Sequence, residues 1–310
     1  MTTATSIVSL SGSNMHSISK ILFLLLLPSI SWASESGHPV TLWLAQGVSN
    51  RVYLLGSVHL LRQQDHPLPA IIDSAYDDAE ALIMELDMDD LDAAEMQRLI
   101  TELGVMQDDS TLHDLMGDAL YAKAAAKAAA IDIPFALYAK SKPWLAAISI
   151  EQLMLARLGF DPAYGIEMYL STMAVMDGKE IRGLESVAEQ IGFLDDLSLR
   201  AQRLLLMQAL DETADIEQVM DDLIHAWRFG DLGFLEDFLL QGMAEDREIY
   251  DTLLVDRNRR WVEDINALLV ENDDYLVIVG AAHLLGDDGV PNLLSRRGVN
   301  ITQLHERAEN

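Results

Sequence analysis

The segment Asp274–Leu285, with the sequence DYLVIVGAAHLL, constrains the fold more than any other part of the chain. Its run Leu276–Val279 is apolar and mostly β-branched, which is the composition of a strand buried on both faces. Gly280 ends the run, and His283 follows it by three residues. Glycine permits a sharp turn or a close backbone approach. The segment therefore predicts a buried strand that delivers a histidine just beyond its carboxyl end.

A similar sequence, RVYLLGSVHLL, occupies Arg51–Leu61, where Gly56 and His59 have the same spacing. Ligands of open α/β sheets bind beyond the carboxyl ends of the strands. We therefore expect the two strands to lie close together in one sheet, with both histidines facing one crevice. For either histidine alone, a hydrogen bond in the core is the competing interpretation.

The rest of the chain predicts an α/β fold: a central mixed β-sheet flanked by helices, with a large all-helical insertion in the middle, at about residues 88–270. No linker rich in Gly, Pro or Ser divides residues 34–310, so we expect a single domain there. Further short strands are expected at 40–44, 81–86, 131–137, 179–184 and 299–304. Helices are expected at 70–80, 88–104, 111–130, 144–158, 168–176, 187–244, 255–270 and 290–297.

Two charged segments stand out against this pattern. Glu85 lies near the end of the apolar run ALIMEL at 81–86, where a carboxylate is costly unless it is paired or bound to a metal. A structural salt bridge to an arginine is the competing explanation. Asp256–Arg260, with the sequence DRNRR, concentrates arginines in an acidic chain. These arginines either serve a site or form a basic helix face that meets acidic neighbours.

The composition excludes several classes of function. The 310 residues carry a net charge of −29, with 50 acidic and 21 basic side chains, and such a surface repels nucleic acid. The chain has no cysteine, which excludes disulfides, thiolate nucleophiles and Cys-ligated metals.

The N-terminus has the pattern of a secretory signal peptide. The first 33 residues contain no acidic residue and one lysine, Lys20, which precedes the apolar run Ile21–Leu27 and the small-residue end at Ala33. That run is far shorter than the ~18 residues of a membrane span. We expect cleavage after Ala33 and a periplasmic or extracellular protein without a transmembrane span; an uncleaved anchor is the alternative. Translation starts at Met1 or at Met15.

Several motifs together resemble the TraB/GumN family, which includes the TIKI Wnt-inactivating proteases and bacterial pheromone-shutdown proteins. They are GSVH at 56–59, MELD at 84–87, DRNRRW at 256–261, GAAH at 280–283, and the stretches GIEMYL and GLESVAEQ. The resemblance extends from about residue 40 to 305. It implies a metal-dependent hydrolase fold related to erythromycin esterase and to the haem-binding ChaN proteins. His59, Glu85 and His283 fall on the motif residues of the family, and Arg257 matches its arginine.

Two imidazoles and one carboxylate suit a divalent metal, such as Zn, Mn or Co, with a position open for water. His59, Glu85 and His283 are therefore the expected metal ligands, and Arg257 is expected to stabilise an oxyanion or to bind a substrate carboxylate. The expected activity is hydrolysis of a peptide or a small ester. A metal-free variant uses a histidine as general base, oriented by a glutamate. The alternative function is a non-catalytic extracytoplasmic binder that sequesters a peptide, haem or metal.

Overall fold

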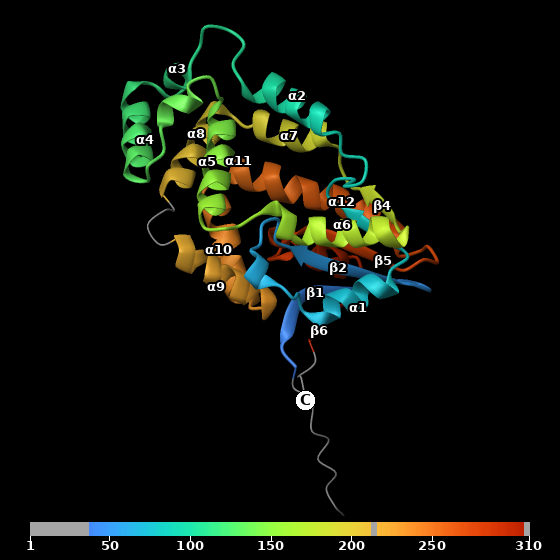
Figure 1. Cartoon of the computed structure of the whole chain (residues 1–310). Helices are drawn as coiled ribbons and strands as arrows, with labels where there is room; N and C mark the ends of the chain where they lie inside the picture. Colours follow the sequence, from blue (N-terminus) through green and yellow to red (C-terminus); the bar gives the residue numbers. More distant parts are fainter. Residues whose placement is uncertain (1–36, 212–215, 307–310) are drawn as a thin grey trace, which may run out of the picture. The chain divides into compact units, whose positions relative to one another are not determined.

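The computed structural model describes residues 37–211 and 216–306 (Figure 1). The predicted signal peptide lies outside these residues. The described chain builds one six-stranded sheet in the order β4-β3-β5-β2-β1-β6. The strands are β1 Pro39–Gln46, β2 Arg51–Ser57, β3 Ala81–Met84, β4 Glu180–Gly183, β5 Tyr275–Gly280 and β6 Asn300–His305.

The sheet is mixed, as the sequence predicts. Strands β4, β3, β5 and β2 run parallel, β1 is antiparallel to β2, and β6 is antiparallel to β1. Strand β5 lies between β3 and β2, and its Gly280 pairs with Ser57 of β2. The prediction that the two strands followed by histidines are neighbours is confirmed. Because parallel strands end at the same edge, the carboxyl ends of four strands meet there.

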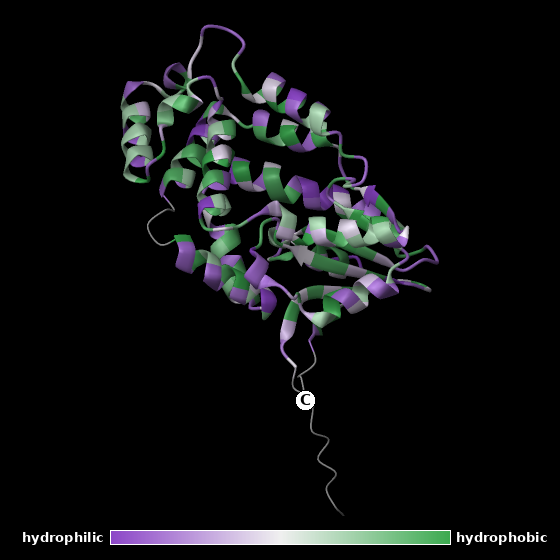
Figure 2. Ribbon diagram, in the orientation of Figure 1, coloured by the Kyte–Doolittle hydropathy of each residue, from purple (hydrophilic) through white to green (hydrophobic). Residues whose placement is uncertain are grey.

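Helices cover both faces of the central strands. Every residue of β3 is buried, as is nearly every residue of β2 and β5, so these strands have no solvated face. In Figure 2 the strands are largely hydrophobic, whereas the surrounding helices mix hydrophobic and hydrophilic residues. The helices that connect or follow the sheet strands are α1 Ala70–Asp78, α6 Ile166–Asp177, α12 Asp256–Leu268 and α13 Val290–Arg296.

The middle of the chain is mainly helical and has a hydrophobic core of its own. Leu112, Ala146, Ile150 and Leu206 are completely buried in this second core. The helices of this region are α2 Ala93–Gly104, α3 Leu112–Met116, α4 Asp118–Ala130, α5 Pro143–Arg157, α7 Val187–Asp195, α8 Leu199–Asp211, α9 Ile216–Arg228, α10 Leu232–Ala244 and α11 Arg247–Tyr250. Strand β4 interrupts the helical stretch, at the position where the sequence predicts a strand.

The structure departs from the expected elements at several points. The helix expected at 111–130 is interrupted at Gly117, whose φ is +75°, and the helical stretch expected at 187–244 is divided into α7, α8, α9 and α10. The strand expected at 131–137 is a turn followed by a 3-10 helix at Phe135–Tyr138. The N–H of Ile133 donates to the carbonyl oxygen of Ala128 at the end of α4, and Pro134 has no N–H to donate to a neighbouring strand. The helix expected from residue 88 begins only at Ala93, where Asp92 caps it by accepting hydrogen bonds from two backbone N–H groups.

In residues 37–211 and 216–306, none of the helices is both long and apolar enough to cross a membrane.

Candidate active site

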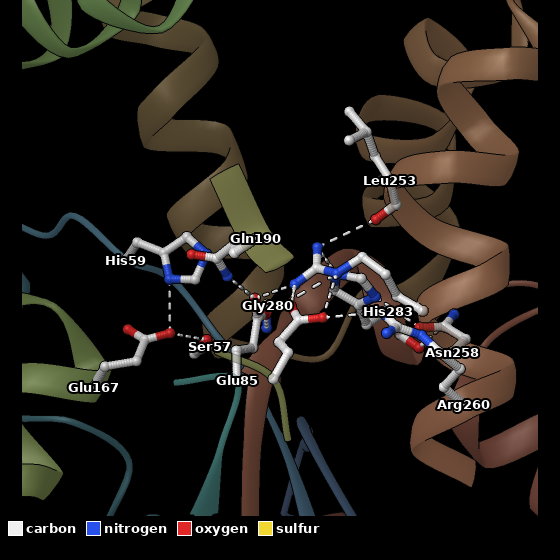
Figure 3. Close-up of polar contacts among 12 residues, drawn as sticks. Ser57, His59, Glu85, Glu167, Gln190, Leu253, Asn258, Arg260, Gly280 and His283 are labelled. Carbon is white, nitrogen blue, oxygen red and sulfur yellow. Dashed lines mark hydrogen bonds and ion pairs between the residues drawn. The ribbon is translucent and has the colours of Figure 1, made fainter. Parts of the chain in front are cut away.

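The carboxyl ends of the four parallel strands each deliver one ionisable side chain to the same region (Figure 3). His59 lies two residues beyond β2, and Glu85 directly follows β3. His283 belongs to the 3-10 turn Ala281–Leu284 after β5, and Glu185 lies two residues beyond β4. Strand order and direction therefore place residues from distant parts of the sequence side by side.

Gly280 lies at the centre of this group. A Cβ atom built on Gly280 would lie 3.3 Å from Glu85 Oε1, 3.4 Å from His59 Nε2 and 3.7 Å from His283 Cδ2. The first two distances are tighter than ordinary van der Waals contact, so a side chain here would press on the site. The structure thus brings together His59, Glu85 and His283 around a position that suits glycine.

His59 is held by a carboxylate that the sequence analysis did not select. Glu167 lies in the first turn of α6, and its Oε1 is 2.7 Å from Nδ1 of His59. The hydroxyl of Ser57 donates a hydrogen bond to the same oxygen. Gly165 makes this approach possible, because a Cβ there would lie 2.1 Å from the carbonyl oxygen of His59. The pairing fixes Nδ1 of His59 and leaves Nε2 directed toward Gly280.

The charge of Glu167 is the main reason that the pKa of His59 is raised to about 9, against the opposing effect of burial. The imidazole is therefore protonated at neutral pH, and its Nδ1–H donates to Glu167. Although protein groups surround the ring, 58 % of the surface of the His59 side chain is exposed to solvent. His59 is the member of the group that solvent can reach.

His283 has the opposite character. Burial lowers its pKa to about 3, so its imidazole is neutral. The amide nitrogen of Asn258 donates to the carbonyl oxygens of His283 and Asp288, which leaves Oδ1 of Asn258 as an acceptor 2.6 Å from Nδ1 of His283. The proton of His283 therefore lies on Nδ1, and its Nε2 carries a lone pair.

Arg257, in α12, uses all five of its N–H donors within the protein. Its Nε donates to Glu185, and its Nη2 donates to both Glu185 and Glu85, the latter at 2.7 Å. Its Nη1 donates to the carbonyl oxygen of Leu253 at 3.2 Å and to Nε2 of His283 at 3.2 Å. Arg257 is buried, and the described contacts leave it no N–H for a substrate.

Glu85 is ionised despite its burial. Burial raises its pKa, but the positive charges of Arg257 and His59 and the N–H of Gly280 outweigh this effect and hold the pKa of Glu85 below its usual range. His283 is neutral and adds no charge to this balance. Gln190 donates to Oε2 of Glu85 at 3.0 Å, and Gly280 N–H donates to Oε1 at 2.7 Å. Glu85 thus both pairs with an arginine and belongs to the site, so the two explanations offered by the sequence do not exclude each other.

The donor types suit a divalent metal, and their spacing fits it in part. Both imidazoles have Nδ1 fixed by an oxygen acceptor, the usual arrangement around a metal-bound histidine. Nε2 of His283 is 3.9 Å from Oε1 of Glu85. However, Arg257 occupies the lone pair of His283, and within residues 37–211 and 216–306 no three His, Cys, Asp or Glu side chains are spaced to hold a metal. Metal binding stays a prediction. It requires that Arg257 releases Nε2 of His283 and that His59 moves closer to Glu85 and His283.

Two cavities open on either side of this group. One has a volume of about 290 Å³ and the other about 610 Å³, and both are lined by His59, Leu60 and Glu85. Arg257 and His283 line the smaller cavity, whereas Glu167 and Gln190 line the larger one. Most of the remaining lining is apolar. Cavities of this size hold small molecules or side chains, so the ionisable group lies between two possible substrate sites.

Comparison with known proteins identifies the family. The sequence profile of the TraB/PrgY/gumN family matches residues 41–303. The chain belongs to the TraB/PrgY/gumN family. It is 26 % identical over 275 residues to the uncharacterized protein YbaP of Escherichia coli (strain K12), covering 85 % of this chain and 96 % of YbaP. An uncharacterized protein of Treponema pallidum (strain Nichols) is 22 % identical over 275 residues, covering 82 % of this chain and 80 % of the relative. No solved structure matches significantly.

The TraB/PrgY/gumN resemblance also contains a signal for the residues that sequence reasoning missed. Glu167 belongs to GIEMYL, Glu185 and Gln190 belong to GLESVAEQ, and Asn258 belongs to DRNRRW. All of these stretches lie within residues 41–303, which match the family. What the sequence does not provide is the pairing of these side chains with His59, Glu85 and His283, which depends on the packing of α6, α7 and α12.

Replacing Glu167 by Gln is expected to bring the pKa of His59 down from about 9, because the substitution removes the largest cause of the increase. An NMR titration of the imidazole protons in metal-free protein measures it. The matched control is Ser57→Ala, which removes a hydrogen bond to Glu167 but keeps its charge, and should preserve most of the shift. An unchanged His59 pKa in Glu167→Gln would contradict the assigned pairing.

Proposed function

We propose that this protein is an exported hydrolase that cleaves an amide or ester bond in a peptide or small ester, and that His59, Glu85 and His283 hold a divalent metal. The supporting observation is the matched orientation of two imidazoles. Each has Nδ1 fixed by an oxygen acceptor and lies with Nε2 near Gly280 or Glu85, where two cavities meet. This is the arrangement that metal-binding histidines share.

Each residue of the group has a role in this proposal. When bound, the metal polarises the scissile carbonyl and lowers the pKa of water. Glu167 and Asn258 orient His59 and His283, and Arg257 keeps Glu85 ionised within an apolar environment. In the overall reaction, the oxygen of water bonds to the carbonyl carbon, the carbon–nitrogen or carbon–oxygen bond breaks, and the leaving group takes a proton.

A metal-free route uses the same residues, and the contact of Arg257 with Nε2 of His283 favours it. Here His59, oriented by Glu167, accepts a proton from water and returns it to the leaving group. Because the pKa of His59 is raised to about 9, mainly by Glu167, the neutral imidazole that this step needs becomes more abundant as the pH rises toward 9. Alkaline activity that survives a chelator is the signature of this route.

Metal removal separates the two routes. We expect the purified mature protein to contain a divalent metal, and dialysis against a chelator to abolish hydrolysis of a peptide and ester panel until metal is restored. Elemental analysis and product formation are measured on the same samples. Full activity in metal-free protein would refute the metal-dependent proposal and support the route through His59.

The second candidate function is a binder that sequesters a peptide, haem or metal. The network around Arg257 favours it, because both ring nitrogens of His283 are engaged within the protein and Glu85 accepts three N–H groups, so neither residue is poised for attack. Stoichiometric binding of a ligand without product, at several pH values and with each metal, would support the binder and exclude the hydrolase.

Export is a separate part of the proposal, and it rests on the signal-peptide pattern of residues 1–33. We expect the mature protein to begin at Ser34 and to be released with the periplasmic or extracellular fraction. N-terminal sequencing of that fraction is the measurement. Recovery of the uncleaved chain in the cytosol would exclude export, and recovery in the membrane would indicate an uncleaved anchor.

A further inference from the structure

We propose that the site accepts a peptide bond flanked on both sides by apolar residues, and that it does not recognise a C-terminal carboxylate beside that bond. This inference rests on the proposed hydrolase function, because it assigns the substrate of the same site. It is carried by the two cavities and by the engagement of every N–H of Arg257.

The two cavities meet at the ionisable group and continue away from it over different helices. The smaller is lined by Leu223 and Trp227 of α9 and by Leu239 of α10. The larger is lined by Met96 of α2 and by Met168 of α6. Each wall is mainly apolar, so burying an apolar substrate group in either cavity is favourable. A bond held between them therefore has an apolar binding site on each side.

Neither cavity offers a cation for a terminal carboxylate. Among the described residues that line the two cavities there is no lysine, and the one arginine is Arg257. All five N–H donors of Arg257 are used by Glu185, Glu85, Leu253 and His283. His59 is cationic, but it lies at the reacting position rather than beyond it. An exopeptidase that binds a free carboxylate next to the scissile bond needs a cation there. The arrangement therefore disfavours a bond next to a free carboxylate.

A peptide fits this arrangement better than a small ester. A peptide presents side chains on both sides of the scissile bond and can fill cavities of about 290 and 610 Å³ at once, whereas a small ester leaves one empty. The net charge of −29 also disfavours acidic residues in the substrate. We therefore commit to an uncharged or basic peptide with apolar residues around the cleaved bond.

The test uses peptides of equal length with both termini blocked, which differ only at the two residues around one bond. The pairs are Leu-Leu, Leu-Ser, Ser-Leu and Ser-Ser, and a further Leu-Leu peptide has a free carboxylate directly after the pair. Rates are measured as kcat/KM, cleavage positions by mass spectrometry, and binding as Kd for ketomethylene analogues that resist cleavage. We expect at least about a 10-fold gain for each apolar residue and no gain from the free carboxylate.

Two variants assign the cavities to the two sides of the bond. Met168→Glu places a charge in the larger cavity, and its position is 41 % exposed, so the fold should tolerate it. Leu239→Glu does the same in the smaller cavity. Each should reduce the preference for Leu on one side of the bond only, and the two variants should affect opposite sides. Val175→Glu on α6 and Phe238→Glu on α10 are matched controls that line neither cavity.

The outcomes separate this inference from the proposed function. Peptide cleavage without an apolar preference, cleavage only next to a free carboxylate, or turnover of esters but not peptides would overturn the inference while leaving a hydrolase. Absence of all turnover, with analogues that still bind with the apolar preference, would overturn the hydrolase but keep the assigned cavities. Analogues that bind without preference, or variants that act on the same side, would overturn the inference.

Discussion

Glu85→Gln should abolish metal uptake and turnover while the protein remains folded. The side chain keeps its shape and can still accept the N–H of Gly280, but it loses the charge that a divalent metal requires. Its new amide group would face N–H donors of Gln190 and Arg257, so we expect a loss of stability of about 1–3 kcal/mol. Glu185 continues to neutralise Arg257, which limits the cost. Bound metal and the melting temperature are measured on the same preparation.

Glu185→Gln is the matched control for this experiment. Glu185 is also buried and also pairs with Arg257, but the described contacts do not connect it with His59 or His283. It should lower stability to a similar or greater extent and leave metal uptake intact. If Glu85→Gln instead keeps its metal and only loses stability, Glu85 is a structural partner of Arg257, and its assignment as a ligand is wrong.

The sheet and its two histidine motifs could be predicted because their signals are local. An apolar β-branched run ended by glycine specifies a buried strand wherever it occurs, and parallel pairing then brings Gly280 beside Ser57. The same logic selected Glu85, since a carboxylate at the end of a buried strand needs a partner. These inferences require only the neighbours of each residue in the sequence.

The environment of the site could not be predicted in this way, because it depends on contacts between distant segments. The opposite pKa shifts of His59 and His283 arise from Glu167 in one case and from burial in the other. The two Gly-x-x-His motifs differ in the residue after the glycine, Ser57 against Ala281, and this difference alone does not indicate the Glu167 that pairs with His59. The engagement of Arg257 by two carboxylates likewise depends on the positions that β3 and β4 give to Glu85 and Glu185. The sequence indicates an arginine near the site but not that its donors are already used.

Arg257→Met should have the largest effect on stability, with an expected loss of about 3–5 kcal/mol at neutral pH. The guanidinium neutralises two buried carboxylates, Glu85 and Glu185, and methionine fills part of its volume without replacing the charge. Arg260→Met, in the same helix, is the matched control. Arg260 also contacts Glu185, but 45 % of its side chain is exposed, so its loss should cost under about 1 kcal/mol. Urea unfolding of both variants and of the unchanged protein gives the values.

The pH dependence of this loss shows whether charge or packing is responsible. Without Arg257, burial raises the pKa values of Glu85 and Glu185 in the folded protein above those in the unfolded chain. Such groups are compatible with folding when protonated, and they cost stability as the pH rises through their unfolded pKa values, near 4.3 for Glu. Because the unfolded chains titrate alike, the deficit of Arg257→Met relative to the unchanged protein grows between the lowered folded pKa of Glu85 in the unchanged protein and the raised folded pKa in the variant. It should therefore already be present at pH 4 and be larger at pH 7. A deficit of equal size at both pH values would show that Arg257 acts through packing, and would refute its role as the cation that keeps Glu85 ionised.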